Sequence, residues 1–298
     1  MPGTLQRSSR PLGHPIDRVT QQWVRATGRR VLLSDHPWLQ GPIGSPELIG
    51  EAWIEREASR LGGHVAPGQS GAGLLASMSA LEGDGFDPAS LRPEIVDFYE
   101  HTADWRVELW SQWSPIALPF GWVLSLLFAH RLQQLSLPLR PLDVAKGMDS
   151  RVIEVVDRSG QSVGAAWIRT LRATGQFVYS GWYGTAVLSK ASRPSVRVAF
   201  PLPNGSATVF LRPYVVDDGG LRLISPHGAF GEEGMYLIVC EENAETAWVR
   251  RVPIVERFDV YVDDDGTVRT DHDLRLWSIP ALRLHYRLER KEARGSRY

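Results

Sequence analysis

Residues 151–288 consist of short alternating apolar and polar runs separated by turn-forming residues, and this pattern constrains the fold most strongly. Alternation with a period of two in β-branched and aromatic residues is typical of strands, whereas Gly, Pro, Asn and Asp clusters between runs are typical of turns. At the centre lies the aromatic run 177–184, whose last four residues are Gly181, Trp182, Tyr183 and Gly184. The pattern predicts a large antiparallel sheet.

The sheet is expected to contain roughly nine or ten strands in a meander, because turn signals divide the apolar runs at short intervals. Three acidic turns, at 157–160, 217–220 and 263–266, each contain glycine and favour hairpins. Pro253 interrupts the long run 248–262 and predicts an edge, a bulge or a corner. A sheet of this size must protect its edges, so a barrel is the first prediction and a β-sandwich the alternative. The expected strands are 152–156, 165–170, 177–183, 196–200, 207–216, 221–224, 235–241, 248–262 and 282–288.

Residues 31–150 favour helices and loops, which makes the predicted fold class α+β. The strongest predicted helix runs from Pro93 to about Trp110, with Ile95, Phe98 and Tyr99 near helical spacing. Ser45 is the expected N-cap of another helix, which should end before the two glycines at 62–63.

The two ends of the chain are expected to be loose. Residues 1–30 carry six arginines against one acid and predict a basic, flexible arm; no apolar signal-peptide region follows them. Residues 290–298 form a polar tail. No Gly/Ser linker separates the predicted helical region (31–150) from the sheet (151–289). We therefore expect 31–289 to fold as one unit, with 93–137 packed on the sheet or across its mouth.

Composition excludes some classes of function. A formal net charge of −1 gives no general affinity for nucleic acid. A single cysteine, Cys240, excludes an intrachain disulfide, fits a cytoplasmic protein and lies in an apolar run typical of a buried thiol. Residues 116–129 are almost wholly apolar but too few to span a bilayer, which needs about 20 residues. They predict a buried helix or, as the alternative, one that lies at a membrane surface.

No motif in the chain specifies a reaction. A phosphate-binding glycine loop, a nucleophile elbow, paired cysteines and a zinc helix are all missing from the sequence, so no cofactor or metal is predicted. Asp271, His272 and Asp273 are adjacent, and three neighbours on a strand cannot all face one ion.

Candidate site residues come from the predicted strands and one loop. His227 lies in the glycine-rich loop 225–234, where a histidine could act as a general acid or base. Aromatic residues inside a barrel would line an apolar pocket. A buried arginine among Arg169, Arg197, Arg212 and Arg257 would require an anionic partner or ligand, although Arg197 and Arg257 are expected to face outward. The predicted ligand-binding residues are Trp167, Tyr179, Trp182, Tyr183, Arg212, Tyr214 and Tyr236.

Three hypotheses follow for function. The first is a cytoplasmic barrel that binds an apolar or aromatic small molecule, extended to a cofactor-independent cyclisation or isomerisation if His227 and a tyrosine move protons. The alternative is a peripheral membrane or lipid-binding protein that docks through residues 116–129. The third is an assembly role, in which a homodimer covers a sheet edge or a tryptophan-rich surface.

Overall fold

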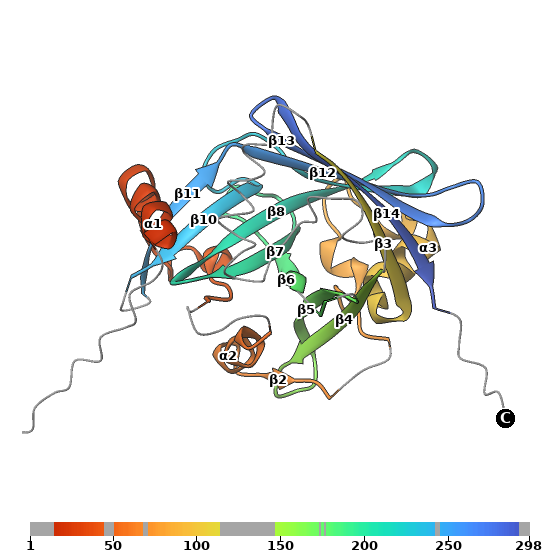
Figure 1. The fold of residues 1–298 in the computed structure, drawn as a ribbon, viewed down its shortest axis with the longest axis horizontal. Helices are drawn as coiled ribbons and strands as arrows, with labels where there is room; N and C mark the ends of the chain where they lie inside the picture. The colour runs from red at the N-terminus through yellow and green to blue at the C-terminus, as the bar shows by residue number, and fades with distance from the viewer. Residues whose placement is uncertain are drawn as a thin grey trace, which may run out of the picture.

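The computed structural model describes residues 15–44, 51–67, 71–113, 147–172, 174–175, 177–241 and 245–291. Within these ranges the protein is mostly antiparallel β-sheet with few helices, and the named strands join one hydrogen-bonded sheet (Figure 1). The large antiparallel sheet predicted for 151–288 is therefore confirmed, whereas the predicted α+β class holds only in its β-rich part, since the described residues form few helices. The strands are β1 (Arg29–Leu32), β2 (His64–Val65), β3 (Trp105–Trp113), β4 (Met148–Val156), β5 (Ser162–Leu171), β6 (Phe177–Ala186), β7 (Ser195–Leu202), β8 (Gly205–Val216), β9 (Gly220–Ser225), β10 (Gly234–Cys240), β11 (Thr246–Val252), β12 (Ile254–Val262), β13 (Val268–Leu276) and β14 (Ile279–Arg290).

The sheet forks at β8. Its main path runs β2-β4-β5-β6-β7-β8-β9-β12-β13-β14-β3. The first half of β8 also pairs with β10, which continues through β11 to β1, whereas residues 212–216 pair with β9. Pro253 separates β11 from β12, as a proline without a backbone N–H is expected to do.

The hydrogen-bonded order ends at β2 and at β3, so the described strands do not close into a barrel. β2 covers only the end of β4, at Val155 and Val156. The remaining edge of β4 comes close to β3. Leu109 of β3, Met148 of β4 and Leu284 of β14 belong to one buried cluster there. Side-chain packing therefore connects the two ends of the sheet where hydrogen bonding does not.

Residues 1–30 are predicted to be a flexible basic arm, but residues 15–30 form a helix and the start of a strand. Helix α1 (Pro15–Thr27) lies against β10 and β11, and β1 pairs with β11 (Figure 1). Val24 of α1 is fully buried, which accounts for the attachment of this basic helix to the sheet. The expected Ser45 cap and residues 116–129 lie outside the described residues.

The helix predicted over 93–110 is correct only in its first half. Helix α3 (Pro93–Glu100) ends at His101, and Trp105–Trp113 form β3, paired with β14. Trp105, Val107 and Leu109 are buried while Arg106 and Trp110 are exposed, which is the period of a strand. The other helices are α2 (Trp53–Arg60) and the short 3-10 turns Pro37–Leu39, Met78–Leu81, Pro88–Ser90, Thr102–Asp104 and Asp217–Gly219.

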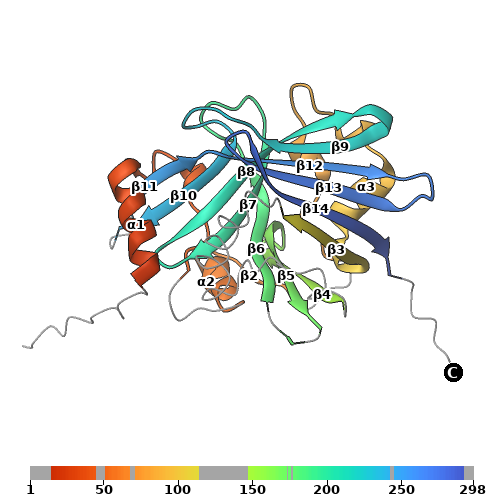
Figure 2. The same cartoon turned by 45° about the horizontal axis from the view of Figure 1, so that its top comes forward.

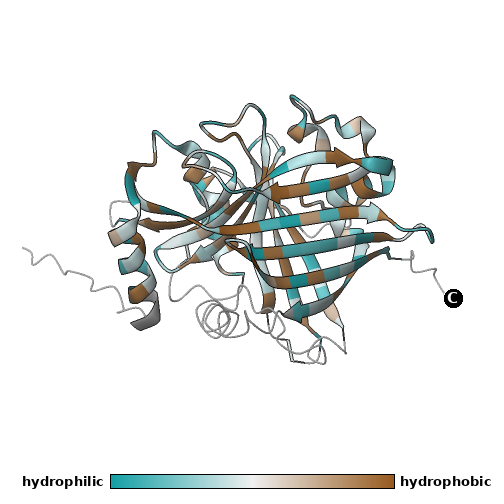
Figure 3. Ribbon diagram, turned by 90° about the horizontal axis from the view of Figure 1, so that it is seen from above, coloured by the Kyte–Doolittle hydropathy of each residue, from teal (hydrophilic) through white to brown (hydrophobic). Residues whose placement is uncertain are grey.

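The two faces of the sheet carry different cores. The inner face packs against α3 and the segment before it, and its cluster includes Leu74, Phe98, Trp167 and Val198. The outer face of β5–β7 is covered by α2, through Trp53 and Ile54. Figure 2 shows α1 and α3 at opposite ends of the molecule. In β12–β14 hydrophobic and hydrophilic bands alternate along each strand, as expected for one buried and one solvated face (Figure 3).

Candidate binding cavity

A cavity of about 130 Å³ lies between the inner face of the sheet and the segment that contains α3. Leu74, Phe98 and Tyr99 line it from the N-terminal side, and β3, β5–β9 and β12–β14 supply the rest of the wall. Most of these side chains are Leu, Val or Phe. The ionisable groups in the wall are Arg169, Glu256, His272 and four tyrosines. An apolar wall with few polar groups is typical of small-molecule sites.

Strand β6 brings two tyrosines into the cavity. Tyr179, Gly181 and Tyr183 occupy alternate positions and so share the inner face. The Tyr179 hydroxyl donates a hydrogen bond to the Tyr183 hydroxyl over 3.0 Å. Gly181 between them leaves the necessary space, because a Cβ there would meet Tyr179 Oη at 3.0 Å and Phe200 Cε1 at 3.1 Å.

A β-bulge between β5 and β6 shapes the same wall. Arg169 pairs with Tyr179 and Thr170 with Phe177, so Val178 has no partner in the β5 register. The extra residue lets both Val178 and Tyr179 line the cavity although they are neighbours in sequence.

Arg169 is the charged group set most deeply into the wall. Its side chain is only 3% exposed, and its guanidinium carbon lies 5.2 Å from the Trp167 ring and 5.5 Å from the Tyr286 ring. Nη2 contacts the sulfur of Met148 at 3.8 Å, and Nε has no hydrogen-bond partner. Trp167 is held by a 2.7 Å hydrogen bond from its indole nitrogen to Ser150. The structure thus presents a buried guanidinium to an apolar cavity.

An acid and a histidine form a second polar group in the wall. His272 Nε2 lies 3.3 Å from Glu256 Oε2, and the imidazole stacks on Phe258 with ring centroids 3.7 Å apart. Strand β13 points Asp271 and Asp273 to the opposite face, where they pair with His285 and with Arg257 and Arg283. His272 and the two aspartates therefore lie on opposite faces of β13.

The cavity tyrosines are neutral at pH 7, and their hydroxyls can donate hydrogen bonds. Burial raises the pKa of Tyr99, Tyr179, Tyr183 and Tyr286 above the ordinary value. Arg169 opposes this effect at Tyr183 and Tyr286, but burial is the stronger influence on each pKa. All four hydroxyls therefore stay protonated.

Three of the predicted ligand-binding residues meet at this cavity, namely Trp167, Tyr179 and Tyr183. The structure does not bring the other four there. Trp182 points to the outer face, where its ring lies 6.4 Å from that of Trp53, because it alternates with Gly181 and Tyr183. Tyr236 packs on the outer aromatic cluster of Trp38, Phe210 and Phe230. The Tyr214 ring lies against the guanidinium of Arg193, at 5.1 Å.

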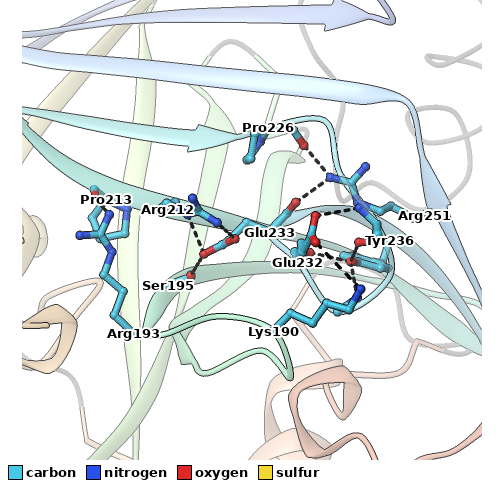
Figure 4. A network of polar contacts seen from close by, with 12 residues as sticks. Lys190, Arg193, Ser195, Arg212, Pro213, Pro226, Glu232, Glu233, Tyr236 and Arg251 are labelled. Carbon is cyan, nitrogen blue, oxygen red and sulfur yellow. Dashed lines mark hydrogen bonds and ion pairs between the residues drawn. The ribbon is translucent and has the colours of Figure 1, made fainter. Parts of the chain in front are cut away.

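Arg212 belongs to a separate polar network (Figure 4). It holds the buried carboxylate of Glu233 with two hydrogen bonds of 3.0 and 2.5 Å, and Ser195 donates a third of 3.1 Å. Arg251 of the same network donates to the backbone oxygens of Pro226 and Glu233. This network fixes the loop 226–233 to the sheet. His227 of that loop is exposed and does not line the cavity.

Of the other two arginines considered from the sequence, neither lines the cavity. Arg257 pairs with Asp259 and Asp273 on the solvated face, as expected. Arg197 is only 9% exposed, so the expectation that it faces solvent is wrong. It alternates with Val196 and Val198 and lies beside Gly41 on the covered outer face, where burial lowers its pKa to about 10.

Sequence reasoning missed Glu256, His272 and Tyr286. The signal was present for His272, since Val268, Thr270, His272 and Leu274 alternate with charged residues. Cys240 is buried, and burial raises the pKa of its thiol to about 11. In the part of the chain that the structure describes, no three His, Cys, Asp or Glu side chains gather as a metal site would require.

Comparison with known proteins gives one distant relative. The chain is 28% identical over 225 residues to a protein of Bacillus subtilis (strain 168) named uncharacterized membrane protein YndJ. The match covers 72% of this chain but only 37% of the relative, so the chain spans little more than a third of that protein. No protein-family model and no solved structure matches the sequence. Among the helices described here, none is both long enough and apolar enough to cross a bilayer.

Proposed function

We propose that this region is a barrel-like container that binds an apolar or aromatic small molecule in the cavity on the inner face of its sheet. The observation that carries the proposal is the cavity itself, enclosed by side chains from nine strands and by Phe98 and Tyr99 of α3. Burial of an apolar ligand there releases water from apolar surface on both partners. Packing between β3 and β4 supports the barrel-like arrangement, although no hydrogen-bonded closure is described.

Titration with the neutral fluorophore N-phenyl-1-naphthylamine tests this proposal. Val198 lines the cavity, so Val198→Phe should fill space and weaken binding about tenfold or more. Val163→Phe is the matched control, because Val163 is exposed on β5 and outside the cavity wall. Equal affinity for the wild type and Val198→Phe, with both variants folded by circular dichroism, would remove the proposal.

Catalysis is an extension of binding. A cofactor-independent cyclisation or isomerisation needs proton donors and acceptors that face the ligand. The wall supplies Tyr183, with its neutral hydroxyl, and the Glu256–His272 pair. His227, the residue chosen from sequence, lies elsewhere. Mass spectrometry of compounds that copurify with the wild type but not with Val198→Phe would identify a ligand, and turnover of it by the wild type alone would establish a reaction.

A peripheral membrane role is the second proposal. The name of the Bacillus subtilis relative and the apolar sequence of residues 116–129 favour it. Flotation with phosphatidylglycerol-containing vesicles tests the idea, with Leu124→Glu/Phe128→Glu as the variant and Val198→Phe as the control. Loss of flotation in the first variant alone would support docking through this segment.

A cytoplasmic location and a homodimer are two further proposals. Cell fractionation tests the first, and sedimentation at several concentrations tests the second.

A further inference from the structure

We propose that the ligand of this cavity is an amphipathic carboxylate, whose anionic oxygens bind Arg169 and whose apolar body occupies the rest of the space. The inference deepens the proposed function and depends on it.

Arg169 has no acid to balance its charge. It is 3% exposed, and among the described residues no carboxylate oxygen lies within the 4.0 Å of an ion pair. A guanidinium carries five N–H donors, and here its partners are the weak acceptor sulfur of Met148 and the neutral hydroxyl of Tyr286. The rings of Trp167 and Tyr286 stabilise the positive charge through their faces, but no anionic acceptor meets the N–H groups. Burial of such a group is costly unless a ligand completes its bonds.

The neighbouring hydroxyls also offer donors. Tyr179 donates to the Tyr183 oxygen, so the proton of Tyr183 remains available to a third group. Burial keeps both hydroxyls protonated by raising each pKa. A planar guanidinium beside a hydroxyl donor matches the two oxygens of a carboxylate, which accept hydrogen bonds and donate none.

Glu256 provides the competing interpretation, in which the ligand is a cation. The two groups differ in burial and in neighbours: Glu256 is 13% exposed and lies 3.3 Å from His272 Nε2 without a hydrogen bond between them, whereas Arg169 is 3% exposed and has no acid beside it. Both act electrostatically on Tyr183 and Tyr286, so both face the same part of the cavity. The more deeply buried charge is positive, and it therefore favours an anionic ligand.

Calorimetric titration of the full chain with three probes of equal chain length decides whether the site prefers an anionic, a neutral or a cationic ligand. Octanoate is expected to bind about tenfold more tightly than 1-octanol, and octylammonium most weakly. Arg169→Met should abolish the preference for octanoate while changing the affinity for 1-octanol by less than about twofold. Tyr183→Phe should weaken octanoate several-fold and leave 1-octanol unchanged. Arg222→Met is the matched control, because Arg222 pairs with Asp259 outside the cavity wall.

The outcomes separate the two proposals. Equal binding of octanoate and 1-octanol would overturn the carboxylate and leave the apolar container intact. Tightest binding of octylammonium would also overturn it and assign recognition to Glu256. Failure of all three probes, together with N-phenyl-1-naphthylamine, would remove the container itself. If Arg169→Met does not fold, the order of the wild-type affinities and the Tyr183→Phe effect still decide the question.

Discussion

Individual residues determine the shape of the cavity wall, and Gly181 shows how little space is left. A methyl group there would lie 3.0 Å from Tyr179 Oη and 3.1 Å from Phe200 Cε1. We predict that Gly181→Ala displaces Tyr179, weakens its bond to Tyr183 and lowers the free energy of unfolding by about 1 kcal/mol. Urea denaturation measures the change. Gly184→Ala on the same strand is the control, because its nearest contact is Trp182 Nε1 at 3.4 Å. Equal losses in the two variants would contradict the prediction.

At the same scale, Glu233 makes stability depend on pH. Burial alone would raise its pKa, but the hydrogen bonds from Arg212 and Ser195 and from its own backbone outweigh burial, so the pKa lies below the ordinary 4.5. A carboxyl with a lowered folded-state pKa stabilises the fold above its unfolded pKa, and this contribution is lost as the pH falls through the folded value. Arg212→Met removes the ion pair and leaves the carboxylate buried.

We predict that Arg212→Met lowers the free energy of unfolding by about 3 kcal/mol at pH 7. This is the lower end of the range for buried ion pairs, because Arg212 is about one-third exposed. The gap between wild type and variant should narrow as the pH falls, because burial without Arg212 raises the pKa of Glu233 in the variant above 4.5 whereas Arg212 holds it below 4.5 in the wild type; the gap should be smallest once the pH lies below the lowered wild-type value. Urea denaturation from pH 7 to pH 3 measures both. Arg222→Met removes a more exposed pair with Asp259 and should cost less than about 1 kcal/mol. A gap that is constant with pH would argue against this account.

Among the elements, α2 is attached to the sheet by Trp53, its largest buried side chain, together with Ile54 and Ala58. Trp53 is 1% exposed, contacts Trp182 edge to face and donates a 2.9 Å hydrogen bond to Ser180. We predict that Trp53→Ala costs about 3–5 kcal/mol in urea denaturation. Because α2 covers the outer face, affinity for 1-octanol should change little. Glu55 is exposed on the same helix, so Glu55→Ala should change the free energy of unfolding by less than about 0.5 kcal/mol. Loss of cavity binding in folded Trp53→Ala would show that the two faces are coupled.

At the scale of the whole molecule, the sheet depends on strands that precede residue 147. β3 pairs with β14 from Leu282 to Arg290, and β1 covers β11. We predict that a fragment of residues 147–291 is insoluble or molten, because β14 loses its neighbour and the cavity loses Phe98 and Tyr99. The measurements are solubility, binding of a hydrophobic dye and thermal melting beside the full chain. A soluble fragment with a sharp two-state transition would show two domains instead of one unit.

The sequence by itself determined most strands and turns between residues 152 and 262, although β4 begins earlier, at Met148. Alternation sets one face of a strand toward a core, and acidic turns with glycine reverse the chain, so both signals are local. Asp157, Asp217 and Asp263 each begin a turn that the structure contains. The strand at residues 105–113 was not predicted, because the helical spacing of apolar residues up to Glu100 was extended into it. Their pairing with β14, about 180 residues away, decided the outcome.

Tertiary structure alone decided which residues share the cavity. Tyr179 and Trp182 are equally aromatic in sequence, and they point to opposite faces because three regular positions of β6 separate them. Arg169 becomes an unpaired charge only because Met148, Trp167 and Tyr286, from three strands, surround it in place of an acid. Strand propensity acts over a few neighbours, whereas desolvation depends on every group within several ångströms. The linear sequence therefore specifies strand propensity, whereas the desolvation of a side chain is decided only in the assembled fold.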